Sequence, residues 1–193
     1  MLNITSVASS VTLTVVGSGR DALPYLRNLA EARASVLIVA SPGAGVATVL
    51  RSIVEAMPPL THEQAYELQA AYKAAGLEWH GERPVRAPHH TISDAGLLDE
   101  RGHYRRGELS LARHGALFLD DAIEFRRGRV AAAVKAADKV GAWVVGACVP
   151  CACGHAYHDQ TRWPCTCTPA LTAAWERRFG ALVRDFAMSL HVR

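Results

Sequence analysis

The chain has 193 residues, which is enough for one well-buried core. Half of its residues are hydrophobic, a fifth are charged and the formal net charge is +3, values that exclude a disordered or fibrous chain and do not by themselves indicate nucleic acid. The first 16 residues lack a basic segment ahead of an apolar one, and no apolar run reaches the roughly 20 residues of a membrane helix. We therefore expect a single domain over residues 1–193, in the cytoplasm and with no membrane partner.

Apolar strands and amphipathic helices alternate through the first third of the chain. The order is a strand at 11–16, a helix at 22–32, an apolar strand at 36–39, a Gly-rich turn at 41–45 and a helix at 46–57. A Gly-rich turn between a buried strand and a helix is typical of a loop that binds phosphate, and it is equally compatible with a tight turn alone.

The middle and end of the chain continue this alternation. Thr61 and Gln64 predict a capping box that starts a helix reaching about Ala75. Residues 76–106 are polar and rich in Gly, Pro and His, which predicts loops and a hairpin. The remaining segments are a strand at 116–119, an Ala-rich helix at 130–140, a strand at 142–147, a Cys-rich loop at 148–168 and a C-terminal helical segment at 169–193. Short apolar strands separated by helices predict a three-layer α/β fold with a parallel sheet.

Two motifs identify a family. Arg86 to Ser93 reads RAPHHTIS, and Gly107 to Asp121 reads GELSLARHGALFLDD. With the weaker matches at 123–127, 150–155 and 190–192, this sequence resembles the magnesium-chelatase-like AAA+ ATPases of the ComM and YifB type from about Val36 onward. The resemblance implies a P-loop NTPase core that works as a ring with ATP between neighbouring subunits. The related helicases move along branched DNA and the chelatase subunits drive metal insertion, so the resemblance leaves the substrate open.

The phosphate loop departs from the family pattern. A Walker A loop needs backbone N–H groups, a Lys for the β- and γ-phosphates and a Ser or Thr hydroxyl for Mg²⁺. In the matching register this chain has Gly43-Ala44-Gly45, then Val46 in place of the Lys and Ala47 in place of the hydroxyl residue, with Thr48 one position late. Because charge-assisted hydrogen bonds contribute about 1.5–3 kcal/mol each, we expect Mg-ATP binding to be weak or absent.

Other catalytic parts of the family are kept, altered or missing. Asp120 and Asp121 match a Walker B strand, with Asp121 shorter than the usual Glu, and two acids at a strand end are also a plain structural feature. Val149 replaces an Asn that would face the γ-phosphate. Between Arg129 and Trp143 only a helix fits where the family has a pore hairpin, and no helical lid domain follows the core. The resemblance makes Arg178 the candidate arginine finger, although exposed helix arginines are commonly solvated surface.

Four cysteines have metal-ligand spacing. Cys151 and Cys153 form one C-x-C pair and Cys165 and Cys167 form another, so four thiolates can converge on one tetrahedral zinc ion in a closed, structural site. His155 or His158 could replace one cysteine, and free or oxidisable thiols are the alternative. Cys148 is best explained as a small buried residue of the preceding strand.

Three functions remain open at this point. The first is a pseudo-ATPase core that acts by self-association or beside a full-length AAA+ relative, and the second is an ATPase that needs a partner for hydrolysis. The third is a nucleic-acid-binding module, possible because a set of arginines surrounds the His-rich segment: Arg83, Arg86, Arg101, Arg105 and Arg106. His89 and His90 belong to the family motif and receive no role.

Overall fold

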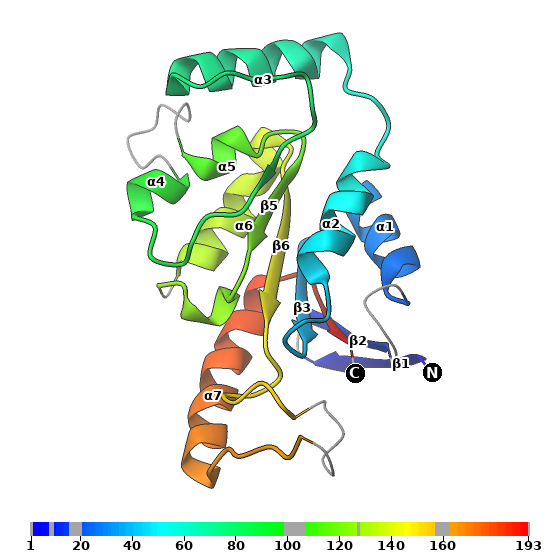
Figure 1. Cartoon of the computed structure of the whole chain (residues 1–193), viewed down its shortest axis with the longest axis vertical. Coiled ribbons are helices and arrows are strands. Elements are labelled where there is room, and N and C mark those ends of the chain that lie inside the picture. The colour runs from blue at the N-terminus through cyan, green and yellow to red at the C-terminus, as the bar shows by residue number, and fades with distance from the viewer. Residues whose placement is uncertain are drawn as a thin grey trace.

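The computed structural model describes residues 2–7, 10–15, 21–98, 107–126, 128–156 and 163–192, the first two segments as backbone only. These residues form a seven-stranded sheet with helices on both faces (Figure 1). In chain order the strands are β1 Leu2–Val7, β2 Ser10–Val15, β3 Val36–Ala40, β4 Val85–Arg86, β5 Ala116–Leu119, β6 Trp143–Cys148 and β7 Met188–Val192.

Five of the strands form the parallel centre of the sheet. The order across the sheet is β1-β2-β7-β3-β6-β5-β4, and every neighbouring pair from β7 to β4 is parallel. Numbered along the chain, these five strands lie in the order 2-3-4-1-5, which is that of a P-loop core. The predicted α/β fold with a parallel sheet is therefore confirmed.

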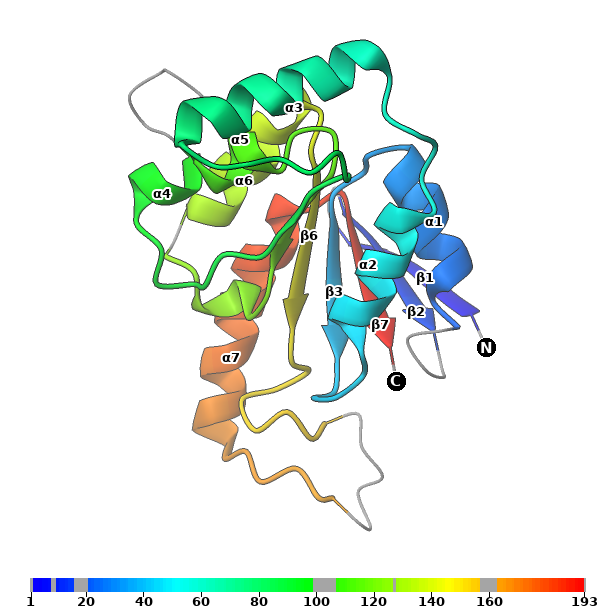
Figure 2. The ribbon, with the colours of Figure 1, turned by 45° about the horizontal axis from the view of Figure 1, so that its top comes forward.

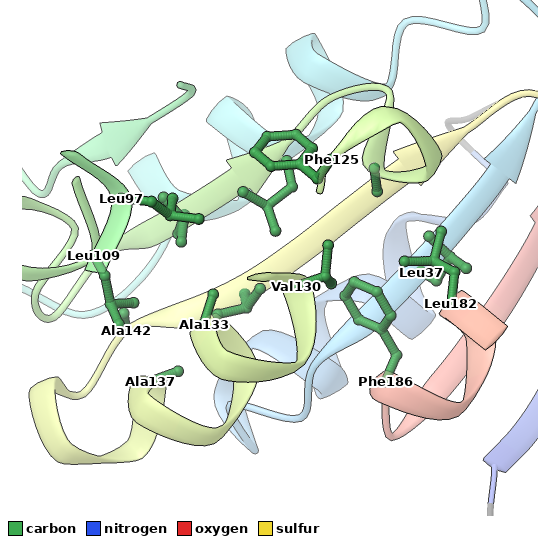
Figure 3. Packing of buried hydrophobic residues seen from close by; sticks show 14 of the residues in the cluster. Leu37, Leu97, Leu109, Phe125, Val130, Ala133, Ala137, Ala142, Leu182 and Phe186 are labelled. Atoms are coloured by element: carbon green, nitrogen blue, oxygen red, sulfur yellow. The ribbon is translucent and has the colours of Figure 1, made fainter. Parts of the chain in front are cut away.

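Alternate residues of the central strands face two separate cores. Leu37 and Val39 of β3 pack with α6 and α7 on one face of the sheet (Figure 3). Val36 and Ile38 pack with α1 and α2 on the other face. Because both faces are covered, β3, β5 and β6 are buried along their whole length, which explains why the sequence shows continuous apolar runs there.

Most of the helices lie where the sequence predicts them. They are α1 Leu23–Glu31, α2 Val46–Glu55, α3 His62–Ala75, α4 Asp94–Leu98, α5 Glu108–Leu111, α6 Arg129–Val140 and α7 Pro169–Leu182, with short 3₁₀ turns η1 Ala122–Glu124 and η2 Val183–Asp185. The capping box at the start of α3 is present, since Thr61 and Gln64 exchange side-chain and backbone hydrogen bonds. Among the described residues, no helix is long and apolar enough to cross a membrane.

Two of the predicted segments differ from the structure. The expected hairpin is not formed by the described residues 76–98, where the two-residue strand β4 instead joins the sheet parallel to β5. The C-terminal segment 169–193 is not helical throughout, because its last described residues form β7 between β2 and β3. The strand MSLHV mixes apolar and polar residues and follows the 3₁₀ turn η2 closely, so the sequence pattern did not separate it from the helix.

Candidate nucleotide edge and metal centre

The loops that follow β3, β5 and β6 meet at one edge of the sheet. Because these strands are parallel and adjacent, their carboxyl ends lie together, the position where α/β sheets bind ligands. The register pairs Val39 with Cys148, so the loop after β3 and the loop after β6 leave the sheet side by side (Figure 2). The first is the phosphate-loop position, and the second contains the cysteines.

The phosphate-loop position is folded as a β-turn. Pro42 and Gly43 are its central residues, Gly43 has a φ of 81°, and the N–H of Ala44 donates to the carbonyl of Ser41 at 3.2 Å. Pro followed by a Gly with positive φ is the pattern of a type II turn. The turn therefore uses the Ala44 N–H internally, where a phosphate cradle would need it pointing at the ligand.

The first residues of α2 offer no charge or hydroxyl at the expected places. Gly45 caps the helix with a φ of 72°, and Val46 is half-buried against the core beneath α2. Ala47 is exposed, and Thr48, one position later, is exposed as well. The structure thus places all six residues from Gly43 to Thr48 at the strand–helix junction, and none of them carries a positive charge.

Asp120 and Asp121 stand exposed at the end of β5. Asp121 has a φ of 49°, and its backbone N–H donates to the Asp120 carboxylate at 3.1 Å. Non-glycine residues seldom adopt this left-handed conformation outside turns and functional sites. Both carboxylates remain available at the edge where a metal-bound phosphate would lie.

A cavity of about 290 Å³ lies between α2, the segment after β4 and the end of β5. Its lining includes Ala47 and Arg51 on one side, His89 and His90 on another, and Asp120 with Asp121. The two imidazole rings lie 4.1 Å apart between centroids, and His89 Nδ1 is 2.8 Å from the Thr91 hydroxyl. The structure therefore brings the histidine pair beside Asp120 and Asp121, which its position in the sequence did not reveal.

The four predicted cysteines converge. Their sulfur atoms all lie within 4.8 Å of one another, and the closest pairs are Cys151–Cys153 at 3.4 Å, Cys153–Cys165 at 3.5 Å and Cys151–Cys165 at 3.8 Å. Four sulfurs at a Zn–S distance of about 2.3 Å in a tetrahedron are about 3.8 Å apart. The donor set and its spacing therefore fit a single tetrahedral ion that prefers thiolates.

The thiols of the cluster differ in pKa. The backbone N–H of His155 is the largest influence that lowers the pKa of Cys153, to about 5, whereas burial raises the pKa of Cys167 to about 12. Cys148 lies outside the cluster, and burial and then the charge of Asp121 raise its pKa to about 12. Among the described residues the metal-ligand cluster contains no histidine, and the alternate His158 lies outside the described residues.

Arg178 contacts its own chain. Its guanidinium donates to the carbonyl of Ile123 at 2.5 Å and to the carboxylate of Glu124 at 2.9 Å, with about half of each side chain exposed. It therefore ties α7 to the 3₁₀ turn that follows β5. An arginine-finger role for Arg178 stays a prediction.

The arginines around the histidine segment are held internally where they are described. Arg86 makes a bidentate ion pair with Glu108, at 2.6 and 2.8 Å, and Arg83 donates to the carbonyls of His114 and Pro58. Hydrogen bonding to Glu108 raises the pKa of Arg86. The other three arginines of the proposed basic surface, Arg101, Arg105 and Arg106, lie outside the described residues.

This ion pair explains part of the family motif that sequence reasoning missed. Arg86 ends β4 and Glu108 begins α5, so the pair joins the two motif segments across 22 residues of chain. Gly115 is equally structural, because a Cβ placed there would lie 2.0 Å from the carbonyl oxygen of Pro84. The sequence shows two residues of opposite charge in adjacent motifs, but no local pattern indicates that they form an ion pair.

The segment between α6 and β6 is short and forms no helix or strand of its own. Residues 128–156 are all described; α6 ends at Val140 and β6 begins at Trp143. The predicted Ala-rich helix is confirmed, and this stretch contains no hairpin. Val149, in the position of the expected Asn, follows β6 directly.

Comparisons with known proteins agree with this architecture. The family described as magnesium chelatase, subunit ChlI, matches residues 18–193. Uncharacterized protein YifB of Salmonella typhimurium is 33% identical over 98 residues, and its Escherichia coli counterpart is 34% identical over 98 residues, each match covering 48% of this chain and 19% of the relative. Competence protein ComM of Haemophilus influenzae is 30% identical over 123 residues, 62% of this chain and 24% of that protein.

The matched part is thus less than a quarter of each of these relatives' length. The strand order and the family match over residues 18–193 lead to one conclusion. The chain belongs to the magnesium chelatase ChlI family and carries its ComM-like AAA+ core.

Proposed function

We propose that this chain is a pseudo-ATPase: an AAA+ core that has lost ATP hydrolysis and acts by assembling with other subunits. The observation that carries the proposal is the junction of β3 and α2. There Val46 and Ala47 replace the cation and the hydroxyl, and the Ala44 N–H is bonded within a turn. Each lost charge-assisted hydrogen bond removes about 1.5–3 kcal/mol of phosphate binding, so losing both should weaken nucleotide binding by about a hundredfold or more.

The partner proposed is a second copy of this chain or a longer AAA+ relative. The segments that YifB and ComM share with this chain are 19% and 24% of their own length, so the assembly of this core with a longer relative is a proposal of its own. A subunit that acts through its surface and does not hydrolyse ATP needs the folded sheet but not the side chains that bind nucleotide. DNA binding stays a prediction, since Arg83 and Arg86 make internal contacts.

Calorimetric titration with ATP tests the loss of the nucleotide site. We expect no heat of binding up to millimolar ATP, with or without Mg²⁺, and no release of phosphate in a parallel assay. Micromolar binding that requires Mg²⁺ would contradict the proposal. Light scattering on the same sample, alone and mixed with a full-length family member, then reports whether the chain assembles.

A partner-assisted ATPase is the second candidate, and the cavity beside Asp120 favours it. Both Walker B carboxylates are exposed there, and the cavity remains open between them and Ala47. A neighbouring subunit would have to supply the missing cation. In that case turnover should appear only on mixing with a relative whose own Walker A Lys has been replaced, and Asp120→Ala in this chain should abolish it.

We further propose that the four-cysteine cluster holds one structural zinc ion. The support is the ligand set and its sulfur spacing, which match a closed tetrahedral site with no position left for water. Elemental analysis should find about one zinc per chain. Substitution with Co²⁺ should give the intense charge-transfer and d–d absorption of tetrahedral thiolate ligation, and a protein without either signal would contradict this proposal.

A further inference from the structure

The cysteine loop touches the phosphate-loop turn directly. A Cβ atom placed on Gly154 would lie 3.0 Å from Pro42 Cγ and 3.2 Å from Pro42 Cδ, with Val149 Cγ1 at 3.8 Å. These atoms meet because β3 and β6 are neighbours in register and their loops run on in parallel. A side chain at position 154 would therefore crowd the Pro42 ring, and the φ of 81° at Gly154 is one that glycine adopts most readily.

Pro42 is the residue through which this contact reaches the turn. It occupies the second position of the turn from Ser41 to Ala44, whose closing hydrogen bond runs from the Ala44 N–H to the Ser41 carbonyl. Opening the turn, as phosphate binding requires, would have to move Pro42 or Gly43. A loop packed on Pro42 therefore resists that opening.

The position of Gly154 depends in turn on the cysteines. Its N–H donates to the carbonyl of Cys151 at 3.0 Å, and the N–H of Cys153 donates to Cys167 Sγ at 3.3 Å. Cys151 is buried, and Cys153 lies 3.5 Å from Cys165 between sulfurs. The short turn 151–154 is thus fixed on one side by the sulfur cluster, and on its other side Gly154 lies close to the exposed Pro42 ring.

We propose that metal binding by the four cysteines clamps the phosphate-loop turn shut. The metal centre is then more than a stabilising knot, because its occupancy sets whether the N–H groups of residues 43–47 can turn toward an anion. The inference rests on the proposed zinc site. It adds that the metal and the emptied nucleotide junction form one coupled unit.

Amide hydrogen exchange measured by mass spectrometry tests the clamp on the full chain. Removing zinc with a chelator should speed exchange of residues 43–47 by about tenfold, while α3 keeps its rate. Gly154→Ala should speed exchange of the same residues while zinc content stays at about one per chain, because Gly154 is not a ligand. Gly81→Ala is the matched control: Gly81 also has a positive φ, of 91°, but a Cβ there meets nothing within 4 Å, so residues 43–47 should exchange as in the parent.

The outcomes separate the two proposals. A chain that binds zinc but exchanges residues 43–47 at the same rate with and without it would overturn the clamp and leave the zinc site intact. A chain that binds neither zinc nor Co²⁺ would overturn the zinc site and the clamp together. Equal acceleration by Gly154→Ala and Gly81→Ala would also overturn the clamp, since the effect would then be general loosening.

Discussion

Two loops at the same edge of the sheet have kept different things. The loop after β3 retains the glycines and the strand–helix geometry of a phosphate site but lacks the cation and the hydroxyl, and one of its N–H groups is used in a turn. The loop after β6 retains a complete set of thiolate ligands at metal-binding distance. The first loop therefore departs from a phosphate site in its side chains and in one backbone N–H, whereas the second has the full donor set of a metal site.

The largest effect should come from removing the ligands of the second loop. Replacing Cys153 and Cys165 by Ser should eliminate bound zinc and lower the free energy of unfolding by about 3 kcal/mol, or the melting temperature by about 10 °C. Calorimetry with metal analysis measures both. Cys148→Ala is the control: it changes a buried cysteine outside the cluster and should keep the zinc. Loss of zinc from this control as well would mean that Cys148 is a ligand.

The ion pair that joins the two family motifs should come next. Arg86→Gln should lower the free energy of unfolding by about 2 kcal/mol, because it leaves the partly buried Glu108 carboxylate without its bidentate partner. Urea unfolding measures the change, and the double variant with Glu108→Gln should cost less than the sum of the two single changes. Arg27→Gln, at an exposed position on α1, should stay within about 0.5 kcal/mol. Strict additivity would show that the pair does not act as a unit.

Restoring the first loop should sharpen the comparison directly. Val46→Lys combined with Ala47→Thr returns a cation and a hydroxyl to the start of α2, and should tighten Mg-ATP binding by about tenfold or more. Calorimetric titration measures the gain, and adding Asp120→Ala should remove its dependence on Mg²⁺. If the double variant binds no better than the parent, the closed turn rather than the missing side chains limits binding.

The smallest effect is expected at the opposite end of the sheet. Glu67 accepts hydrogen bonds from Arg113 and His114, and the bond from Arg113 is the largest influence holding the pKa of Glu67 below its usual 4.5. A lowered pKa in the folded state adds stability above about pH 4.5, which is lost as the pH falls through the folded-state value. Glu67→Gln should therefore lower the melting temperature at pH 7 by about 2 °C or less and leave it unchanged near pH 3, with zinc content unaltered.

Local patterns in the sequence predicted the parts of this fold that local interactions determine. The apolar run of β3, the capping box at Thr61 and the helix α6 were found because their signals lie within a few residues. The two C-x-C pairs likewise predicted the sulfur cluster, since two pairs joined by one loop have little choice but to meet. In contrast, β4 is only two residues long, and its place in the sheet depends on pairing with β5 some 30 residues later.

The position of the candidate site in the fold was predictable, but its local conformation was not. Resemblance to the family placed Asp120 and the strand–helix junction at the edge of the sheet, and the structure agrees. The turn over Ser41 to Ala44 was missed although Pro42 followed by Gly43 is its usual signal, because the same glycines fit a phosphate loop. The Arg86–Glu108 pair and the contact of Gly154 with Pro42 depend on tertiary packing alone, so no pattern along the chain could have shown them.

Strands β1 and β2 extend the sheet beyond β7, so β7 is not an edge strand. Both strands lie ahead of the family match, which begins at residue 18, yet β2 is paired in parallel along the whole of β7. The last strand of the P-loop core is therefore an interior strand here, and its backbone groups have partners on both sides. On this side β1 is the outermost strand among the described residues, and it lies outside the family match, so a subunit that extended the sheet there by strand addition would pair with β1.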